Sequence, residues 1–238
     1  MSAKTLIIDG NHVSAEEGSS ILQAARDHGI NIPTLCHLDG VYDLGACRLC
    51  VVELKGSPKL LPACTTKVAE GMDITTQSER LAKYRRMILE LLLAERNHVC
   101  SICVANGHCG LQGLAWQLGV DHVRYEYMFP KWGLDTTHRL YGLDHNRCIL
   151  CNRCVRACWH IEGAGTKNVA GRGANSRIIN DLNQPWGDSE TCTECGKCVM
   201  ACPTGALFKK GTTAAESERD REKLNFIVNA REKHQWNV

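Results

Sequence analysis

The arrangement of the cysteines limits what this chain can fold into more than any other feature of its sequence. There are 15 of them in 238 residues, and an odd number cannot be paired completely as disulfides. They fall into four blocks: Cys36, Cys47, Cys50 and Cys64; Cys100, Cys103 and Cys109; Cys148, Cys151, Cys154 and Cys158; and Cys192, Cys195, Cys198 and Cys202. We therefore expect a fold organised around metal centres, in which metal binding supplies part of the folding free energy.

The third and fourth blocks carry the most specific spacing. Both read C-x2-C-x2-C-x3-C, and Pro203 follows the last cysteine. In bacterial ferredoxins the first three cysteines of such a run hold one [4Fe–4S] cluster, and the fourth ligates the other cluster. The predicted ligand sets are therefore Cys148, Cys151, Cys154 and Cys202 for one cluster, and Cys158, Cys192, Cys195 and Cys198 for the second. Two zinc sites are the alternative, but zinc usually takes separated C-x2–4-C pairs.

The first block, C-x10-C-x2-C-x13-C, follows a segment typical of a β-grasp ferredoxin. Thr5–Ile8 and 12–15 are predicted strands around an Asp9-Gly10 turn, and Ser19 or Ser20 is the expected cap of the next helix. Further strands are predicted at 50–54 and 59–62. The expected occupant of Cys36, Cys47, Cys50 and Cys64 is a [2Fe–2S] cluster, and a structural zinc is the alternative.

The second block has three cysteines, one too few for a four-iron cluster. His98 lies two residues before Cys100 and is the predicted fourth ligand, giving the set His98, Cys100, Cys103 and Cys109. His108, beside Cys109, is the rival. Because neutral imidazole replaces a thiolate, this third [4Fe–4S] cluster should have a different potential from its all-cysteine neighbours, as in Rieske centres.

These patterns predict an α+β chain with five segments. The segments are a [2Fe–2S] β-grasp domain at 1–77, a helical segment with the one-histidine, three-cysteine site at 78–119, a linker at 120–142, a two-cluster ferredoxin domain at 143–211 and a helical tail at 212–238. Within the helical segment, a long helix capped by Ser78 should run to about Glu95, and a short helix is expected at 111–118.

Composition and missing motifs exclude several classes of function. The net charge of +2 does not suggest a nucleic-acid partner. The longest apolar run, 87–94, contains Glu90 and is too short for a bilayer, and no signal segment is visible, so we expect no membrane span and a cytoplasmic location. No G-x-G-x-x-G or P-loop motif is complete, so we expect no NAD or FMN site and no catalytic residue in this chain. All cysteines are assigned to clusters, which leaves none for a nickel site.

The stretches at 95–103 (ERNHVCSIC) and 143–158 (LDHNRCILCNRCVRAC), in this domain order, resemble a known family. The chain is similar to the small diaphorase subunit of bidirectional, NAD-reducing [NiFe]-hydrogenases, and to the N-terminal parts of the large complex I iron–sulfur subunit and of [FeFe]-hydrogenases. This resemblance implies an oxidoreductase subunit that carries electrons between a flavin- and NAD(H)-binding diaphorase subunit and the small and large [NiFe]-hydrogenase subunits.

Three alternatives stay open at this stage. An equivalent subunit of a complex I module or of an NAD-linked formate dehydrogenase would have the same clusters. A zinc-stabilised interaction scaffold would have no redox role, and a free-standing ferredoxin-like shuttle would have no permanent partner.

Overall fold

A tight hairpin opens the N-terminal sheet. Asp9 and Gly10 both have positive φ, 49° and 81°, as the two central positions of a type I′ turn require. The turn joins β1 (Ala3–Ile8) to β2 (Asn11–Glu16), with Ile8 opposite Asn11. The predicted hairpin is therefore confirmed in the computed structural model, which describes residues 3–212.

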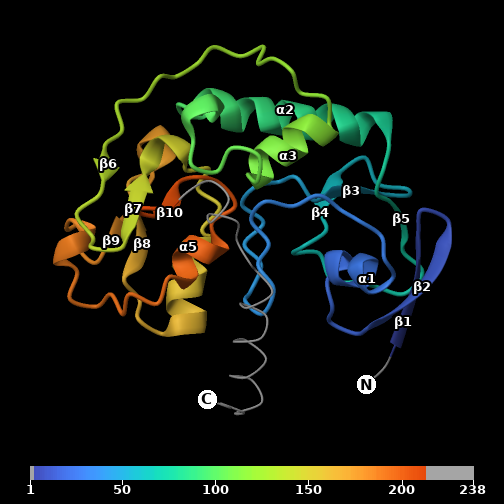
Figure 1. Ribbon diagram of the computed structural model, residues 1–238. Coiled ribbons are helices and arrows are strands. Elements are labelled where there is room, and N and C mark those ends of the chain that lie inside the picture. The colour runs from blue at the N-terminus through green and yellow to red at the C-terminus, as the bar shows by residue number, and fades with distance from the viewer. Residues whose placement is uncertain (1–2, 213–238) are drawn as a thin grey trace. The chain divides into compact units, whose positions relative to one another are not determined.

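The hairpin belongs to a five-stranded sheet in the order β2-β1-β5-β3-β4. The remaining strands are β3 (Val51–Leu54), β4 (Leu60–Pro62) and β5 (Asp73–Thr75). Only the β1–β5 pair is parallel. Helix α1 (Ile21–Asp27) begins after Ser20, whose Oγ accepts a 3.2 Å hydrogen bond from the backbone N–H of Gln23. The buried face of α1 shares one apolar core with the strands, as a β-grasp fold requires (Figure 1).

Helix α2 (Glu79–Glu95) follows the sheet. Its predicted cap is present, since the N–H of Leu81 donates to Ser78 Oγ at 3.1 Å. Arg85 on this helix is buried and donates to the carbonyls of Leu49 and Val51 at 3.1 and 2.8 Å. These bonds hold α2 against the cysteine loop of the first block.

The described chain forms two compact units. One comprises the chain up to His37 with Asp43–Glu90 and Leu114–Asp121, and the other comprises Leu38–Tyr42, Leu91–Gly113 and the chain from His122. Helix α3 (Gly110–Gln117), predicted at 111–118, contributes residues to both.

The second unit contains a three-stranded sheet in the order β10-β7-β6. Its strands are β6 (Leu134–Asp135), β7 (Tyr141–Asp144) and β10 (Leu207–Lys209), and a separate hairpin pairs β8 (Lys167–Ala170) with β9 (Arg177–Asn180). Strand β6 lies in the segment expected to be a linker and pairs with β7. Two residues are too few to show a periodic pattern, so this strand could not be predicted from the sequence.

Each ferredoxin-type cysteine run leads into a helix, and the two helices end differently. Helix α5 (Lys197–Ala201) stops before Cys202, because Pro203 disfavours helical geometry at the residue before it. Helix α4 (Arg153–Arg156) has no proline after its run and continues as a π-helical turn, Ala157–Glu162, which ends at Gly163 with φ 85°. Short 3₁₀ turns lie at Cys100–Ile102, His145–Arg147, Gly173–Asn175 and Trp186–Asp188.

The cysteines themselves form much of the core of the second unit. Its buried cluster combines the aliphatic residues Leu143, Ile178, Val199, Ala206 and Leu207 and the indole of Trp186 with Cys148, Cys154, Cys198 and Cys202. Within residues 3–212, no helix is long and apolar enough to cross a membrane. The predicted helical tail from 212 onward falls almost wholly outside the described residues.

Candidate metal centres

The structure brings the third and fourth cysteine blocks together crosswise around two cavities. One cavity is lined by Cys148, Cys151, Cys154 and Cys202. The other is lined by Cys158, Cys192, Cys195 and Cys198. Each predicted ligand set therefore surrounds its own space, and each combines cysteines from both runs. A polynuclear cluster bound through four thiolates fits such a donor set.

The thiols enclose spaces and do not converge on a point. Within residues 3–212, no group of three or more His, Cys, Asp or Glu side chains is arranged to hold a single metal ion. Burial, together with the neighbouring Cys151, raises the pKa of Cys148 to about 12, and burial raises that of Cys198 to about 12 against the opposing charge of Lys167. Binding a cluster must therefore displace these protons, which couples cluster loading to folding.

Hydrogen-bond donors point at several of the sulfurs. Trp186 Nε1 lies 3.4 Å from Cys192 Sγ, and His138 Nε2 lies 3.8 Å from the same sulfur. The backbone N–H of Leu150 donates to Cys148 Sγ at 3.4 Å. Such contacts are one of the ways in which a protein sets a cluster potential.

Sequence reasoning missed Trp186 and His138. Both are buried, and their rings stack with Tyr141 in a group of three. No spacing rule could have found this group, because His138 and Tyr141 lie 45 or more positions before Trp186 in the sequence. The three residues come from the predicted linker, from β7 and from a 3₁₀ turn. The aromatic content of the linker was the only available signal.

The first block also gathers its four predicted residues. Cys36, Cys47, Cys50 and Cys64 are all buried. The Cys36 thiol contacts those of Cys47 and Cys64, which lowers the pKa of Cys36, and the contact with Cys36 raises the pKa of Cys47. The backbone N–H of Leu35 donates to Cys47 Sγ at 3.4 Å. The donor set, the burial and the shared protons fit a cluster bound by thiolates.

The three cysteines of the second block lie near one another in the second unit. Cys103 interacts electrostatically with both Cys100 and Cys109, and Cys109 also interacts with Cys202. Gly205 lies directly against Cys103, because a Cβ built on this glycine would lie 2.4 Å from the Cys103 sulfur. This block is therefore adjacent to the end of the ferredoxin segment.

His98 has the surroundings of a metal ligand, although no hydrogen bond within residues 3–212 joins its ring to the three cysteines of the block. Burial, with Arg147 and Arg96 nearby, lowers its pKa to about 4, so the imidazole is neutral at physiological pH. The carbonyl of Leu92 accepts a hydrogen bond from the ring, while Nε2 is buried without a hydrogen-bond partner among the described residues. One nitrogen bonded to a backbone carbonyl and the other free is the usual arrangement of a metal-binding histidine.

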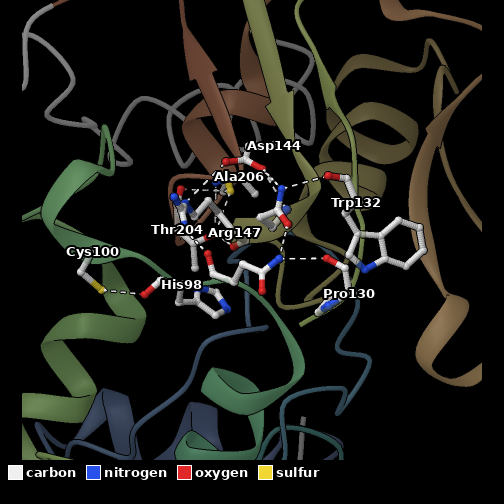
Figure 2. Close-up of polar contacts among 11 residues, drawn as sticks. His98, Cys100, Pro130, Trp132, Asp144, Arg147, Thr204 and Ala206 are labelled. Atoms are coloured by element: carbon white, nitrogen blue, oxygen red, sulfur yellow. Dashed lines mark hydrogen bonds and ion pairs between the residues drawn. The ribbon is translucent and has the colours of Figure 1, made fainter. Parts of the chain in front are cut away.

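The rival His108 shares one of these properties, since its Nε2 is also buried without a partner in the described chain. Figure 2 shows that the His98 carbonyl, not its ring, faces Cys100, whose Sγ lies 3.7 Å from that oxygen.

A polar network holds the backbone before this block (Figure 2). Arg147 donates to the carbonyl of Asn97, and Thr204 Oγ1 donates to the carbonyl of Arg147 at 2.7 Å. The amide of Asn97 donates to the Pro130 carbonyl at 2.9 Å and to the side chain of Asn146 at 2.8 Å. The segment at His98 is thus fixed by residues of the two-cluster region.

Three family models match consecutive parts of the chain. Residues 3–79 match a 2Fe-2S iron–sulfur cluster binding domain, residues 85–124 match the iron–sulfur binding region of NADH-ubiquinone oxidoreductase G, and residues 147–207 match a 4Fe-4S dicluster domain. Fold and site together define an iron–sulfur protein with a 2Fe-2S domain at its N-terminal end and a 4Fe-4S ferredoxin domain toward its C-terminal end.

Comparison with similar proteins identifies the family to which the chain belongs within this class. The gamma subunit of the NAD-reducing hydrogenase HoxS of Cupriavidus necator is 31% identical, over 86% of this chain and 86% of its own length. A solved structure of NAD⁺-reducing [NiFe]-hydrogenase in the H2-reduced state contains a chain that is 34% identical, with a TM-score of 0.83 and 89% of both chains covered. This chain belongs to the family of the HoxS gamma subunit.

Other relatives are longer. The alpha subunit of the NADPH-Fe(3+) oxidoreductase of Geobacter sulfurreducens is 39% identical over 87% of this chain, but the match spans only 24% of that protein. The chain therefore spans about a quarter of the length of this longer relative.

Proposed function

We propose that this chain is the cytoplasmic electron-transfer subunit of an NAD-reducing hydrogenase complex. In this proposal it relays single electrons through four clusters between a flavin- and NAD(H)-binding diaphorase subunit and the [NiFe]-hydrogenase subunits. The observation that carries the proposal is the pair of cavities, each lined by four cysteines drawn from both ferredoxin runs. The similarity to HoxS gamma over most of both chains supports the complex in which this function would operate.

We assign one [2Fe–2S] cluster to Cys36, Cys47, Cys50 and Cys64. The three [4Fe–4S] clusters are assigned to His98 with Cys100, Cys103 and Cys109; to Cys148, Cys151, Cys154 and Cys202; and to Cys158, Cys192, Cys195 and Cys198. Bound clusters supply one-electron redox chemistry, and the protein supplies position, burial and tuning of the potentials. The residues of this chain bind and orient the clusters and exclude water, and none is required as acid, base or nucleophile.

Metal analysis of the native complex tests this function. A tag on the full chain should co-purify flavin, nickel and iron. Molybdenum or tungsten in place of nickel would instead indicate a formate dehydrogenase. Flavin and iron without nickel, molybdenum or tungsten would indicate a complex I module. Zinc as the only metal would overturn the proposal in favour of a scaffold.

The full chain expressed alone, with its clusters reconstituted, provides the cluster count. We expect about fourteen irons per chain, since one [2Fe–2S] and three [4Fe–4S] clusters contain that number. A stable value near ten would mean that one four-iron site is not filled, and the EPR spectrum would identify which signal is missing.

A further inference from the structure

Lys167 is a buried cation at the edge of one cluster cavity. It begins strand β8, is 1% exposed, and lines the cavity that contains Cys158, Cys192, Cys195 and Cys198. Its Nζ donates to Asn180 Oδ1 at 2.5 Å and lies 3.1 Å from the centre of the Trp186 ring. Both partners are neutral groups.

Glu194, which lines this cavity, and Glu162, which lies beside it, are both compensated by ion pairs. Glu194 pairs with Arg139 at 2.6 Å, and its other oxygen lies 3.6 Å from His138. Glu162, which contacts the Cys195 thiol, pairs with Lys197. Within residues 3–212, Lys167 forms no direct ion pair with a carboxylate, although it interacts electrostatically with Asp135. A buried ammonium without a directly paired counter-charge is costly, so a negative group close to it would stabilise the site.

The thiols supply the candidate for that negative group. The ammonium of Lys167 interacts electrostatically with Cys198, Cys154, Cys192 and Cys158, three of which belong to its own cavity. Once these sulfurs are thiolates of a bound cluster, Lys167 faces a net negative charge at short range. Attraction of this kind is strong where water is excluded.

We propose that Lys167 is the counter-cation of the cluster bound by Cys158, Cys192, Cys195 and Cys198, and that its charge raises the reduction potential of that cluster. This inference rests on the proposed function, because it needs the cluster to be present. Reduction adds a negative charge to the cluster, and a fixed cation beside it stabilises the reduced form more than the oxidised form. Net charge near the cluster is one of the main determinants of its potential.

The cavity that contains Cys148, Cys151, Cys154 and Cys202 has no lysine or arginine among the described residues that line it. Besides its cysteines it is lined by the aliphatic residues Leu143, Ile149, Ile178, Ala206 and Leu207 and by the uncharged polar residues Asn152 and Thr204. Arg96 interacts with Cys148 but does not line the cavity. The two cavities therefore differ in their lining within the described chain, since a lysine lines one of them and no cation lines the other.

A potentiometric titration of the full, cluster-loaded chain, followed by EPR, tests the inference. Lys167→Met removes the charge, Lys167→Gln removes it while keeping a donor for Asn180, and Lys167→Arg keeps it. Lys209→Met is the control, because Lys209 lies on β10 in an exposed position. Cys195→Ser identifies the signal that belongs to the cavity of Lys167.

We expect Lys167→Met and Lys167→Gln to reduce the equilibrium constant for reduction of that cluster at least tenfold, or about 59 mV for a one-electron couple. A smaller shift should reach the neighbouring cluster through Cys154. Lys167→Arg and Lys209→Met should leave both potentials near the wild-type values.

Unchanged midpoint potentials would overturn the inference. If Lys167→Gln retains full iron content and every midpoint stays where it is in the wild type, Lys167 is a structural residue of the β8–β9 hairpin and the inference is wrong. That outcome would leave the proposed function intact. Absence of the cluster from the wild-type chain would instead count against the proposed function itself.

Discussion

The indole Nε1 of Trp186 donates a hydrogen bond of 3.4 Å to the Sγ of Cys192. The indole is buried, so water cannot replace this donor if it is lost. A donor to a cluster sulfur stabilises the more negative, reduced state. Trp186→Phe should therefore lower the potential of the cluster bound by Cys192, by roughly 20–60 mV on the scale of 59 mV per tenfold change. EPR titration measures the shift, and an unchanged midpoint at full iron content would show that this bond has no influence on the potential.

Crosswise ligation predicts which pairs of cysteine substitutions act on one cluster. Cys148→Ser and Cys202→Ser should each remove about four irons, and the double variant should lose no more than either alone. Cys148→Ser combined with Cys158→Ser should lose about eight, because the two residues serve different clusters. Iron and sulfide analysis of each variant measures these losses. The reverse pattern of losses would mean that each run holds its own cluster.

Substitutions of His98 and His108 can show which of the two histidines is a ligand of the cluster proposed at the second cysteine block. His98→Cys should keep that cluster and lower its potential, because a thiolate replaces a neutral imidazole and makes the cluster more negative. His98→Ala should lose about four irons, and His108→Ala should lose none. The measurement is EPR titration together with iron analysis. Loss of iron in His108→Ala alone would transfer the ligand role to His108.

The close approach of Gly205 to Cys103 predicts a selective defect. An alanine at 205 would place its Cβ 2.4 Å from the Cys103 sulfur and 3.3 Å from the Cβ of Ala105. Relief of such an overlap typically costs about 1–3 kcal/mol and should displace Cys103. Gly205→Ala should therefore lose the cluster of the second block and keep the two ferredoxin clusters.

Gly113→Ala is the matched control for Gly205→Ala. Gly113 lies inside α3, and a Cβ there meets nothing within 4 Å. Alanine favours a helix interior over glycine by about 1 kcal/mol, so this variant should hold full iron and unfold at slightly higher temperature. Equal iron content in both variants would contradict the prediction for Gly205.

His145 should make stability depend on pH in the weakly acidic range. Burial lowers its pKa, Arg96 and Arg177 lower it further, and Asp144 and Asp135 oppose the shift. Between the folded-state pKa and about 6.5, the unfolded chain binds more protons, so the free energy of unfolding rises with pH. This contribution is complete above about pH 6.5 and is lost as the pH falls below it.

His145→Phe should flatten that dependence. The ring packs on Trp132 with 5.9 Å between centroids, and its Nδ1 is buried without a partner in the described chain, so phenylalanine preserves the packing and breaks no bond at this atom. Anaerobic urea unfolding at about pH 5.5 and about pH 7.5 measures the difference. His122→Phe, at an exposed position, should keep the wild-type dependence.

The sequence predicted those parts of the fold that depend on local chemistry. The Asp9-Gly10 turn, the Ser20 and Ser78 caps and the helices after them follow from backbone preferences of single residues. The cysteine spacing also predicted the two groups of four that now line separate cavities. The turn and the caps need no knowledge of distant parts of the chain, and the crosswise grouping follows from the motif that both cysteine runs share.

What could not be predicted depends on contacts between distant segments. Lys167 and Trp186 look like ordinary surface or core residues in sequence, and only the fold places them beside the same cavity. Strand β6 falls in the segment predicted to be a linker, because two residues are too few to show a pattern, although its Asp135 accepts a 2.8 Å hydrogen bond from the backbone N–H of Trp186. The domain boundaries at 77, 119, 142 and 211 stay predictions.

The sharing of each cavity between two cysteine runs also constrains the order of events during synthesis. The proposed ligand set of the first block would be complete once Cys64 has left the ribosome. With the proposed ligand sets, neither ferredoxin cluster could be fully ligated until residues about 44 positions beyond the first run have been made, because one set includes Cys198 and the other includes Cys202. We therefore expect the thiols of the first run to stay reduced while the second run is translated.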